Sequence, residues 1–248
     1  MIPHCPRPWT VKAGLNASCG SSPQGYKNMS NPATSVDVID RVLADEVLAF
    51  DRVVRKTVPY AHIVSPRFYT ETFADTLLDW LESQQDWHLR EGILFEQYEL
   101  GFSRFTHCKE IEGLWDGAVL GRLRDAVTRA IGYPVSGRIN IHAHKLVPGQ
   151  FTNIHTDMIP EETHRLVVQL NRGRADDSGG NLMLLTGARP ADISVVFKQD
   201  SNSAVGFKLG AESFHAVGRV KEGTRFTIIY TFLADSTPEG KYKNFVAS

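Results

Sequence analysis

The most informative segment of the chain reads Pro148-Gly149-Gln150-Phe151-Thr152-Asn153-Ile154-His155-Thr156-Asp157-Met158. It lies shortly after a change in the spacing of apolar residues. Up to about residue 132 they recur every three to four positions, and from about Arg138 onward they alternate or stand in short runs. Successive side chains of a strand point to opposite faces, so residues i and i+2 share one face. An extended conformation here therefore presents the His155 imidazole and the Asp157 carboxylate to the same point.

Short apolar segments divided by turn-forming residues fill the second half of the chain. Clusters of Gly, Pro, Asp and Ser, such as 148–149 and 176–180, separate them. Many short strands with frequent turn signals are typical of a sandwich or a jelly roll. We expect a mainly β protein with a double-stranded β-helix (jelly-roll) core of about eight strands over about 135–233. Its strands are the segment that carries His155 and the segments 138–147, 164–170, 180–185, 193–197, 204–209, 214–220 and 226–232.

The first half shows the helical period. Apolar residues from Val36 to Phe50 predict a helix, with Asp37 near its start. Pro59 is expected to end it, because proline lacks a backbone N–H. A short strand is expected at 60–64.

Two further helices are expected before the β core. One runs from about Pro66 to Leu81, and one from Leu114 to Ile131, where Gly132 provides a C-terminal stop. Residues 87–105 fit either strands or a long loop. Helices first and strands second predict a single domain over 31–248, with helical support over about 36–132 packed on one face of the β core.

Composition narrows the classes of partner. Of the 248 residues, 42% are hydrophobic and 22% charged, which suits a soluble globular protein. The 27 Lys and Arg balance the 28 Asp and Glu, so the chain has no overall charge that would attract nucleic acid or an anionic membrane. Three scattered cysteines indicate a reducing cytoplasm, and no apolar run approaches the roughly 20 residues of a membrane span.

Residues 1–30 are rich in Pro, Gly, Ser and Asn and have no continuous apolar core of the kind a signal peptide needs. We expect a disordered leader there, or upstream sequence before a start at Met29.

A second histidine completes a candidate metal site. His215 stands in the strand-like run 213–217, and Arg225 follows ten positions later. The chain between Asp157 and His215 is long enough for about five strands, so His215 can return opposite the first pair. Two imidazoles and one carboxylate are the ligand set of non-haem Fe(II) oxygenases. A His-x-Asp pair alone is common and also fits a surface histidine near a turn, but these residue types in this order predict a metal site.

These motifs resemble those of the Fe(II)/2-oxoglutarate-dependent dioxygenases, most closely the prolyl-4-hydroxylase-like branch. The resemblance covers about Arg138 to Phe232, and the segments that carry it are 148–151, 155–157, 179–182, 213–217 and 225–227. It implies that His155, Asp157 and His215 hold Fe(II) and form the catalytic centre. It also implies that 2-oxoglutarate chelates the metal and that O2 takes the remaining position, with ascorbate as a candidate reductant.

The resemblance implies a second contact to 2-oxoglutarate. Arg225 would meet the distal carboxylate, which a planar guanidinium can do through two parallel hydrogen bonds. Thr227 shares its strand face and is a candidate hydroxyl donor, although threonine is also an ordinary strand residue.

The chain departs from the family in one region. Many relatives carry a tyrosine about ten residues before the first ligand, where this chain reads His144-Lys145-Leu146. Lys145 is a candidate to bind 2-oxoglutarate or an anionic substrate, and the alternative is an outward-facing lysine. His142 and His144 share a strand face and are interpreted as core or surface residues. His164 and Arg165 are candidates for the border of the pocket.

The resemblance predicts an oxygenase that oxidises an amino acid derivative, a peptide or another small metabolite, with release of succinate and CO2. Hydroxylation is expected, with desaturation or cyclisation as alternatives, in small-molecule or natural-product metabolism. Asp157 argues against halogenation, because halogenating relatives lack the metal carboxylate. Relatives that repair nucleic acid carry a second arginine where this chain has Thr231. The other readings are a catalytically silent jelly-roll binding protein and a cupin-type metalloenzyme that does not use 2-oxoglutarate. The oligomeric state stays undefined.

Overall fold

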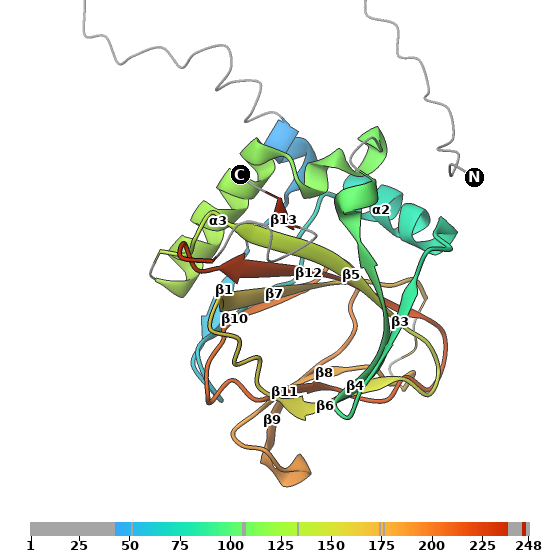
Figure 1. Ribbon diagram of the computed structural model, residues 1–248, viewed down its shortest axis with the longest axis vertical. Helices are drawn as coiled ribbons and strands as arrows, with labels where there is room; N and C mark the ends of the chain where they lie inside the picture. Colours follow the sequence, from blue (N-terminus) through green and yellow to red (C-terminus); the bar gives the residue numbers. More distant parts are fainter. Residues whose placement is uncertain are drawn as a thin grey trace, which may run out of the picture.

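The protein is described by a computed structural model, which covers residues 43–237 apart from 51, 106, 107, 133, 174 and 176, and the backbone of Phe245–Val246. The described strands form one curled antiparallel sheet (Figure 1). They are β1 Val54–Lys56, β2 His62–Ser65, β3 His88–Glu91, β4 Phe95–Gly101, β5 Ile139–Leu146, β6 Phe151–His155, β7 Glu162–Leu170, β8 Leu182–Leu185, β9 Ile193–Phe197, β10 Ala204–Lys208, β11 His215–Val217, β12 Arg225–Leu233 and β13 Phe245–Val246.

The strand order is β1-β2-β10-β7-β12-β5-β4-β6-β11-β8-β9, with β3 paired to β4 and β13 to β5. In Figure 1 the sheet bends into two layers, one around β5, β7 and β12 and one around β6, β8 and β11. Strand β4 joins the layers, because its end pairs with β5 and its start pairs with β6. The strands β5 to β12 make eight, so the predicted jelly-roll core is confirmed.

The helices cover the outer face of the first layer (Figure 1). They are α2 Glu71–Ser83 and α3 Gly117–Ile131, with 3-10 turns η1 Phe102–Arg104, η2 Lys109–Leu114 and η3 Pro190–Asp192. One apolar cluster joins Leu77 of α2 and Leu123 of α3 to Ile228 and Tyr230 of β12. All nine residues of β12 are buried, since the helices cover one face and the interior of the curl the other. The prediction of helices on one face of the β core is confirmed.

The start of α2 differs from the prediction. Pro66 does not begin the helix, because Thr70 is the N-cap and its side chain accepts a hydrogen bond from Phe73 N. The backbone before it is bonded elsewhere: Phe68 N donates to Asn202 O over 2.7 Å and Tyr69 N to Asn202 Oδ1 over 2.8 Å. These bonds hold residues 68–69 extended, and a threonine cap then starts the helix.

The end of α3 confirms the predicted glycine stop. Gly132 has φ +93° and its N–H bonds to Thr128 O over 2.9 Å. Asp116 caps the other end by accepting from the backbone N–H groups of Ala118 and Val119, so the helix begins three residues later than predicted.

The predicted first helix is wrong in its extent. Residues 43–47 are helical, but the backbone then bonds to the segment before α2, through Thr70 N to Val47 O and Ala49 N to Phe68 O. Pro59 therefore ends no helix and lies between β1 and β2. The predicted leader and the helical residues 36–42, with Asp37, lie outside the described residues.

Residues 87–105 take the strand alternative, because they contain β3, β4 and η1. Within the part of the chain that the structure describes, no helix has both the length and the apolar character needed to cross a membrane.

Candidate active site

The three predicted metal ligands meet at one point inside the curl. Strands β6 and β11 are paired so that His155 lies opposite His215. Strand β6 ends at His155, and the chain continues without regular structure through Asp157. The ligand atoms of the three side chains lie within 4.8 Å of one another, the one such group among the described residues. His155 Nε2 is 3.4 Å from Asp157 Oδ1, and His215 Nε2 is 3.1 Å from Asp157 Oδ2.

Both imidazoles are oriented by the same local device. His155 Nδ1 lies 2.8 Å from Asn153 O, and His215 Nδ1 lies 2.8 Å from Ser213 O. A carbonyl oxygen accepts only, so each Nδ1 carries a proton and each Nε2 is the ring atom that faces Asp157. Neutral imidazoles with free Nε2 atoms beside an ionised carboxylate are the form that binds a transition metal.

Asp157 is ionised although it is largely buried. Burial alone would raise its pKa, but the contacts from His155, His215 and Arg165 hold the pKa well below its usual range. Arg165 on β7 pairs with Asp157 through Nη1 and with Glu162 through Nη2 over 2.6 Å. Burial lowers the pKa of His215, which keeps that ring neutral. The donor set therefore fits a divalent cation.

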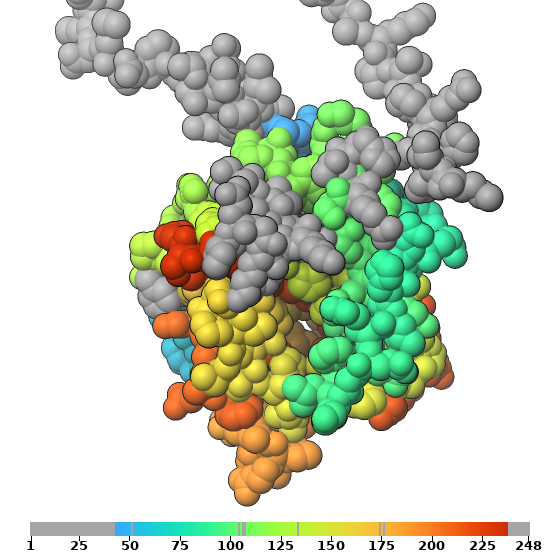
Figure 2. Space-filling view, viewed as in Figure 1, coloured from blue at the N-terminus to red at the C-terminus, as the bar shows by residue number. Residues whose placement is uncertain are grey.

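The triad opens into a cavity of about 430 Å³, within the usual range of ligand pockets of roughly 300–1,000 Å³. Figure 2 shows the molecule hollowed between the green surface of β3 and β4 and the yellow surface of the chain near residue 160. The cavity is lined by residues from both layers of the sheet: Leu94, Phe95, Gln97, Glu99, His142, His144, Thr152, His155, Thr156, Asp157, Met158, Ile159, Arg165, Val167, Leu182, His215, Val217, Arg225, Thr227 and Ile229.

Arg225 and Thr227 lie in the same cavity as the three candidate ligands. Both side chains line the cavity from the start of β12. The exposed fraction is 2% for Arg225 and 0% for Thr227. Arg225 Nη1 donates to Thr227 Oγ1 over 3.4 Å. A guanidinium can bind a carboxylate through two parallel hydrogen bonds, so a cavity that Arg225 lines suits a ligand with a carboxylate.

Lys145 is not among the residues that line the cavity, an arrangement that favours the outward-facing alternative. Its Nζ lies over the rings of Trp87 and Tyr98, 4.7 and 4.8 Å from their centroids. Side chains alternate along β5, so His144 faces the cavity and Lys145 faces the opposite side.

The sequence suggested that His142 and His144 are core or surface residues. In the structure both line the cavity. Their rings are tilted by 48° to each other, with centroids 4.7 Å apart. Gln97 and Glu99 of β4 lie beside them, because β4 pairs with β5; neither residue was singled out individually from the sequence. Arg165 was a candidate for the pocket border and does line it, whereas His164 is not among the lining residues.

Comparison of this chain with known proteins gives information about its fold. A scan against family models finds no match, and a search of curated proteins finds none either. Solved structures do match. A prolyl-4-hydroxylase from Pseudomonas putida has a TM-score of 0.54 at 16% identity, over 67% of this chain and 91% of that chain.

Two further structures agree. A prolyl hydroxylase from Trichoplax adhaerens, in complex with a hypoxia inducible factor oxygen degradation domain peptide fragment, has a TM-score of 0.54 at 12% identity over 81% of this chain and 93% of that one. A prolyl 4-hydroxylase from Phytophthora capsici has a TM-score of 0.54 at 18% identity over 87% of this chain and 70% of that one. The chain therefore has the fold of the prolyl-4-hydroxylase-like branch of the 2-oxoglutarate oxygenases, and it carries a His-Asp-His group that could hold a metal.

Proposed function

We propose that the protein is an Fe(II)- and 2-oxoglutarate-dependent oxygenase that oxidises an amino acid derivative, a peptide or another small metabolite. One observation supports this most strongly: the His155, Asp157 and His215 ligand atoms meet in a cavity that also contains the buried guanidinium of Arg225. A metal face and a carboxylate-binding cation in one cavity match the two ends of 2-oxoglutarate.

Each residue has a role in this proposal. His155 and His215 donate Nε2 to Fe(II), and Asp157 supplies the anionic oxygen. Arg225 and Thr227 bind the distal carboxylate of 2-oxoglutarate and so orient its other end toward the metal. The iron supplies the oxidising chemistry once O2 and 2-oxoglutarate are bound, with succinate and CO2 as the other products.

Apolar walls limit water around the reacting atoms. Leu182, Val217 and Ile229 line the cavity near the polar groups. Exclusion of water strengthens the electrostatic contacts inside and protects reactive species from side reactions.

A peptide or amino acid derivative is the favoured substrate class. The Trichoplax adhaerens neighbour holds a peptide fragment, and this chain has the same fold. The identity of the oxidised C–H bond is left to a screen of amino acids, peptides and metabolites for stimulated succinate release, with product mass separating hydroxylation from desaturation.

The first test is an anaerobic titration with Fe(II) and 2-oxoglutarate. We expect a weak visible charge-transfer band that requires both additions. Arg225→Ala should weaken 2-oxoglutarate binding about a hundredfold, because it removes charge-assisted hydrogen bonds, while iron binding changes little. Arg189→Ala is the matched control, since Arg189 is exposed and pairs with Asp192.

The alternatives give different results. A catalytically silent binding protein would bind neither iron nor 2-oxoglutarate at this site. A cupin-type enzyme would bind iron without 2-oxoglutarate, and Arg225→Ala would then leave every binding constant unchanged. Retained turnover in His155→Ala, Asp157→Ala and His215→Ala would place the metal elsewhere.

A further inference from the structure

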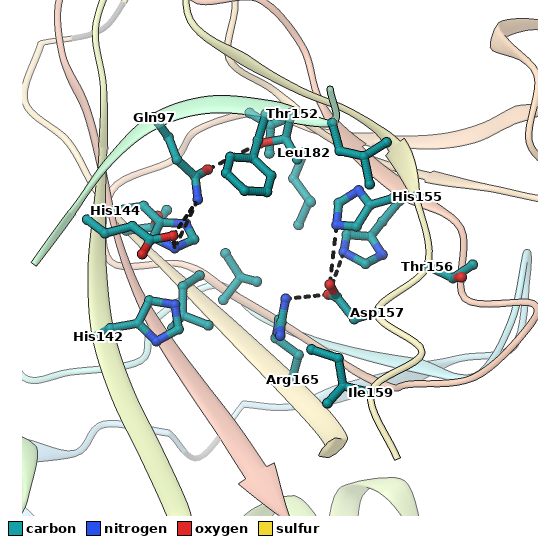
Figure 3. Close-up of a pocket in the computed structure, with 18 of the residues that line it drawn as sticks. Gln97, His142, His144, Thr152, His155, Thr156, Asp157, Ile159, Arg165 and Leu182 are labelled. Atoms are coloured by element: carbon teal, nitrogen blue, oxygen red, sulfur yellow. Dashed lines mark hydrogen bonds and ion pairs between the residues drawn. The ribbon is translucent and has the colours of Figure 1, made fainter. Parts of the chain in front are cut away.

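His215 differs from the other two candidate ligands in how its backbone is held. It begins β11, a strand of three residues, whereas four residues of β6 precede His155. Asp157 is held by a side-chain contact from Arg165, which Figure 3 marks together with the contact from His155. The direction of the His215 ring therefore depends on the residues just before it.

A tight turn fixes the carbonyl that orients this ring. Ser213 N donates to Gly210 O over 3.2 Å. Ser213 Oγ donates to the same oxygen over 2.8 Å and accepts from Gly210 N over 3.0 Å. Ser213 O then accepts from His215 Nδ1. The turn sets the position of Ser213, and the peptide that joins Phe214 to His215 has a support of its own.

Tyr60 provides that support from the first half of the chain. It lies in the bend between β1 and β2, and its hydroxyl donates to Phe214 O over 3.0 Å. Leu185 N of β8 donates to the same oxygen over 2.9 Å. The Phe214 carbonyl and the His215 Cα lie in one peptide plane. One hydrogen bond lets this plane turn about the bond, whereas a second bond from another element fixes its direction.

The ring of Tyr60 also supports His215, through a second residue. Its centroid is 5.9 Å from that of Phe207, at an interplanar angle of 67°. Phe207 is fully buried, and its centroid lies 4.9 Å from that of the His215 ring at an angle of 56°. Inclined aromatic pairs at these distances are favourable. Tyr60 therefore acts on the backbone of His215 through Phe214 and on its ring through Phe207.

The Tyr60 hydroxyl keeps its proton. Burial raises the pKa of Tyr60 well above its usual value, and the negative charge of Asp157 raises it further. A protonated phenol is a donor. The hydrogen bond to Phe214 O is therefore present throughout the neutral pH range.

We propose that Tyr60 is a positioning residue of the metal centre. Its hydroxyl on the Phe214 carbonyl and its ring behind Phe207 hold His215 Nε2 at the point where it meets Asp157 Oδ2, over 3.1 Å. A segment that precedes the jelly-roll core thus completes the metal centre. This proposal rests on the metal site of the proposed function and adds a residue that acts through other residues.

The test is a Co(II) titration of Tyr60→Phe, which keeps the ring and removes the hydroxyl. Co(II) stands in for Fe(II), because its visible d–d bands report the ligand geometry and their growth gives the affinity. We expect the Co(II) affinity to fall about three- to tenfold, with altered bands. This is less than the roughly 10–100-fold that is typical of a partner bonded directly to a metal ligand, because Tyr60 acts through Phe214.

Tyr230→Phe is the matched control. It removes the same atom from another buried tyrosine, whose hydroxyl lies 2.7 Å from that of Tyr69 on the outward side of β12. We expect its Co(II) affinity and bands to equal those of the unaltered protein, although it loses stability. Equal changes in the two variants would overturn the proposal, because they would show a general loosening of the fold.

A rescue separates the hydrogen bond from the shape of the side chain. Tyr60→4-aminophenylalanine places an N–H donor where the hydroxyl stood, so it should restore the Co(II) affinity and the bands. The proposal is overturned if this variant behaves like Tyr60→Phe, or if Tyr60→Phe itself matches the unaltered protein. A Tyr60→Phe protein that does not fold would also overturn it, by showing that the hydroxyl serves folding.

The outcome can be told apart from that of the proposed function, because the Co(II) titration uses neither 2-oxoglutarate nor O2. A protein that binds Co(II) but gives no charge-transfer band with Fe(II) and 2-oxoglutarate would refute the oxygenase alone, and the Tyr60 comparison would stand. An unaltered protein that binds no Co(II) would refute the metal centre and both proposals with it.

Discussion

The two faces of strand β12 show how one segment serves two purposes. Ile228, Tyr230 and Phe232 point outward into the apolar cluster that contains the helices. Arg225 and Thr227 point inward and line the cavity. Alternate residues of the same strand are therefore expected to affect different properties: the outward ones the free energy of unfolding, and the inward ones the binding of ligands.

Strand β5 repeats this division beside β12. Ile141 and Ala143 belong to the outward cluster, while His142 and His144 face the cavity. The register pairs Thr227 with His144 and Ile229 with His142, so the inward residues form continuous rows across the sheet. A change on one face should leave the other face intact.

The largest expected effect comes from the outward face. Phe232→Ala removes a ring that is 0% exposed and leaves a cavity beneath the helices. We expect the free energy of unfolding to fall by about 3–5 kcal/mol, measured by denaturant titration. Affinity for Fe(II), measured where the variant is still folded, should stay within about twofold. A large loss of metal affinity in folded protein would show that the two faces are coupled.

The same division explains what the sequence could predict. His155 and Asp157 were candidates because residues two positions apart share one face of an extended chain, and their side chains do meet although β6 ends at His155. The jelly-roll core was found because turn residues mark the ends of its strands. Both signals are local.

The sequence is less informative about which side of a strand faces the cavity and about which strands pair, because both depend on distant residues. Counting back from His155 singled out Lys145, whereas the residues of β5 that line the cavity are His142 and His144. Gln97 and Glu99 joined the cavity because β4 pairs with both β5 and β6, a contact between the two halves of the chain. The extent of the first helix was wrong for a similar reason, since Phe68 and Thr70 took over its backbone bonds.

A middle-sized effect is expected at an outward hydrogen bond. The hydroxyls of Tyr69 and Tyr230 lie 2.7 Å apart, and both side chains are 0% exposed. Tyr230→Phe leaves the Tyr69 hydroxyl buried without this partner, so we expect a loss of about 1–3 kcal/mol in unfolding free energy. The double variant Tyr69→Phe/Tyr230→Phe removes both groups and should be less destabilised than the sum of the two single variants, by denaturant titration of all four proteins. Additive losses would mean that the hydroxyls do not interact.

The smallest effect on stability is expected on the inward face. Thr227→Val keeps the shape of a β-branched side chain and removes the hydroxyl that accepts from Arg225. Stability should change by about 1 kcal/mol or less, because a neutral hydrogen-bond partner of a charged group at 3.4 Å contributes modestly. Affinity for 2-oxoglutarate in the anaerobic titration should fall roughly three- to tenfold, and Thr231→Val, two pleats further along the same face, is the matched control. Unchanged 2-oxoglutarate affinity in Thr227→Val would make Thr227 an ordinary strand residue. Arg225 would then be the inward-facing residue of β12 that is proposed to bind 2-oxoglutarate.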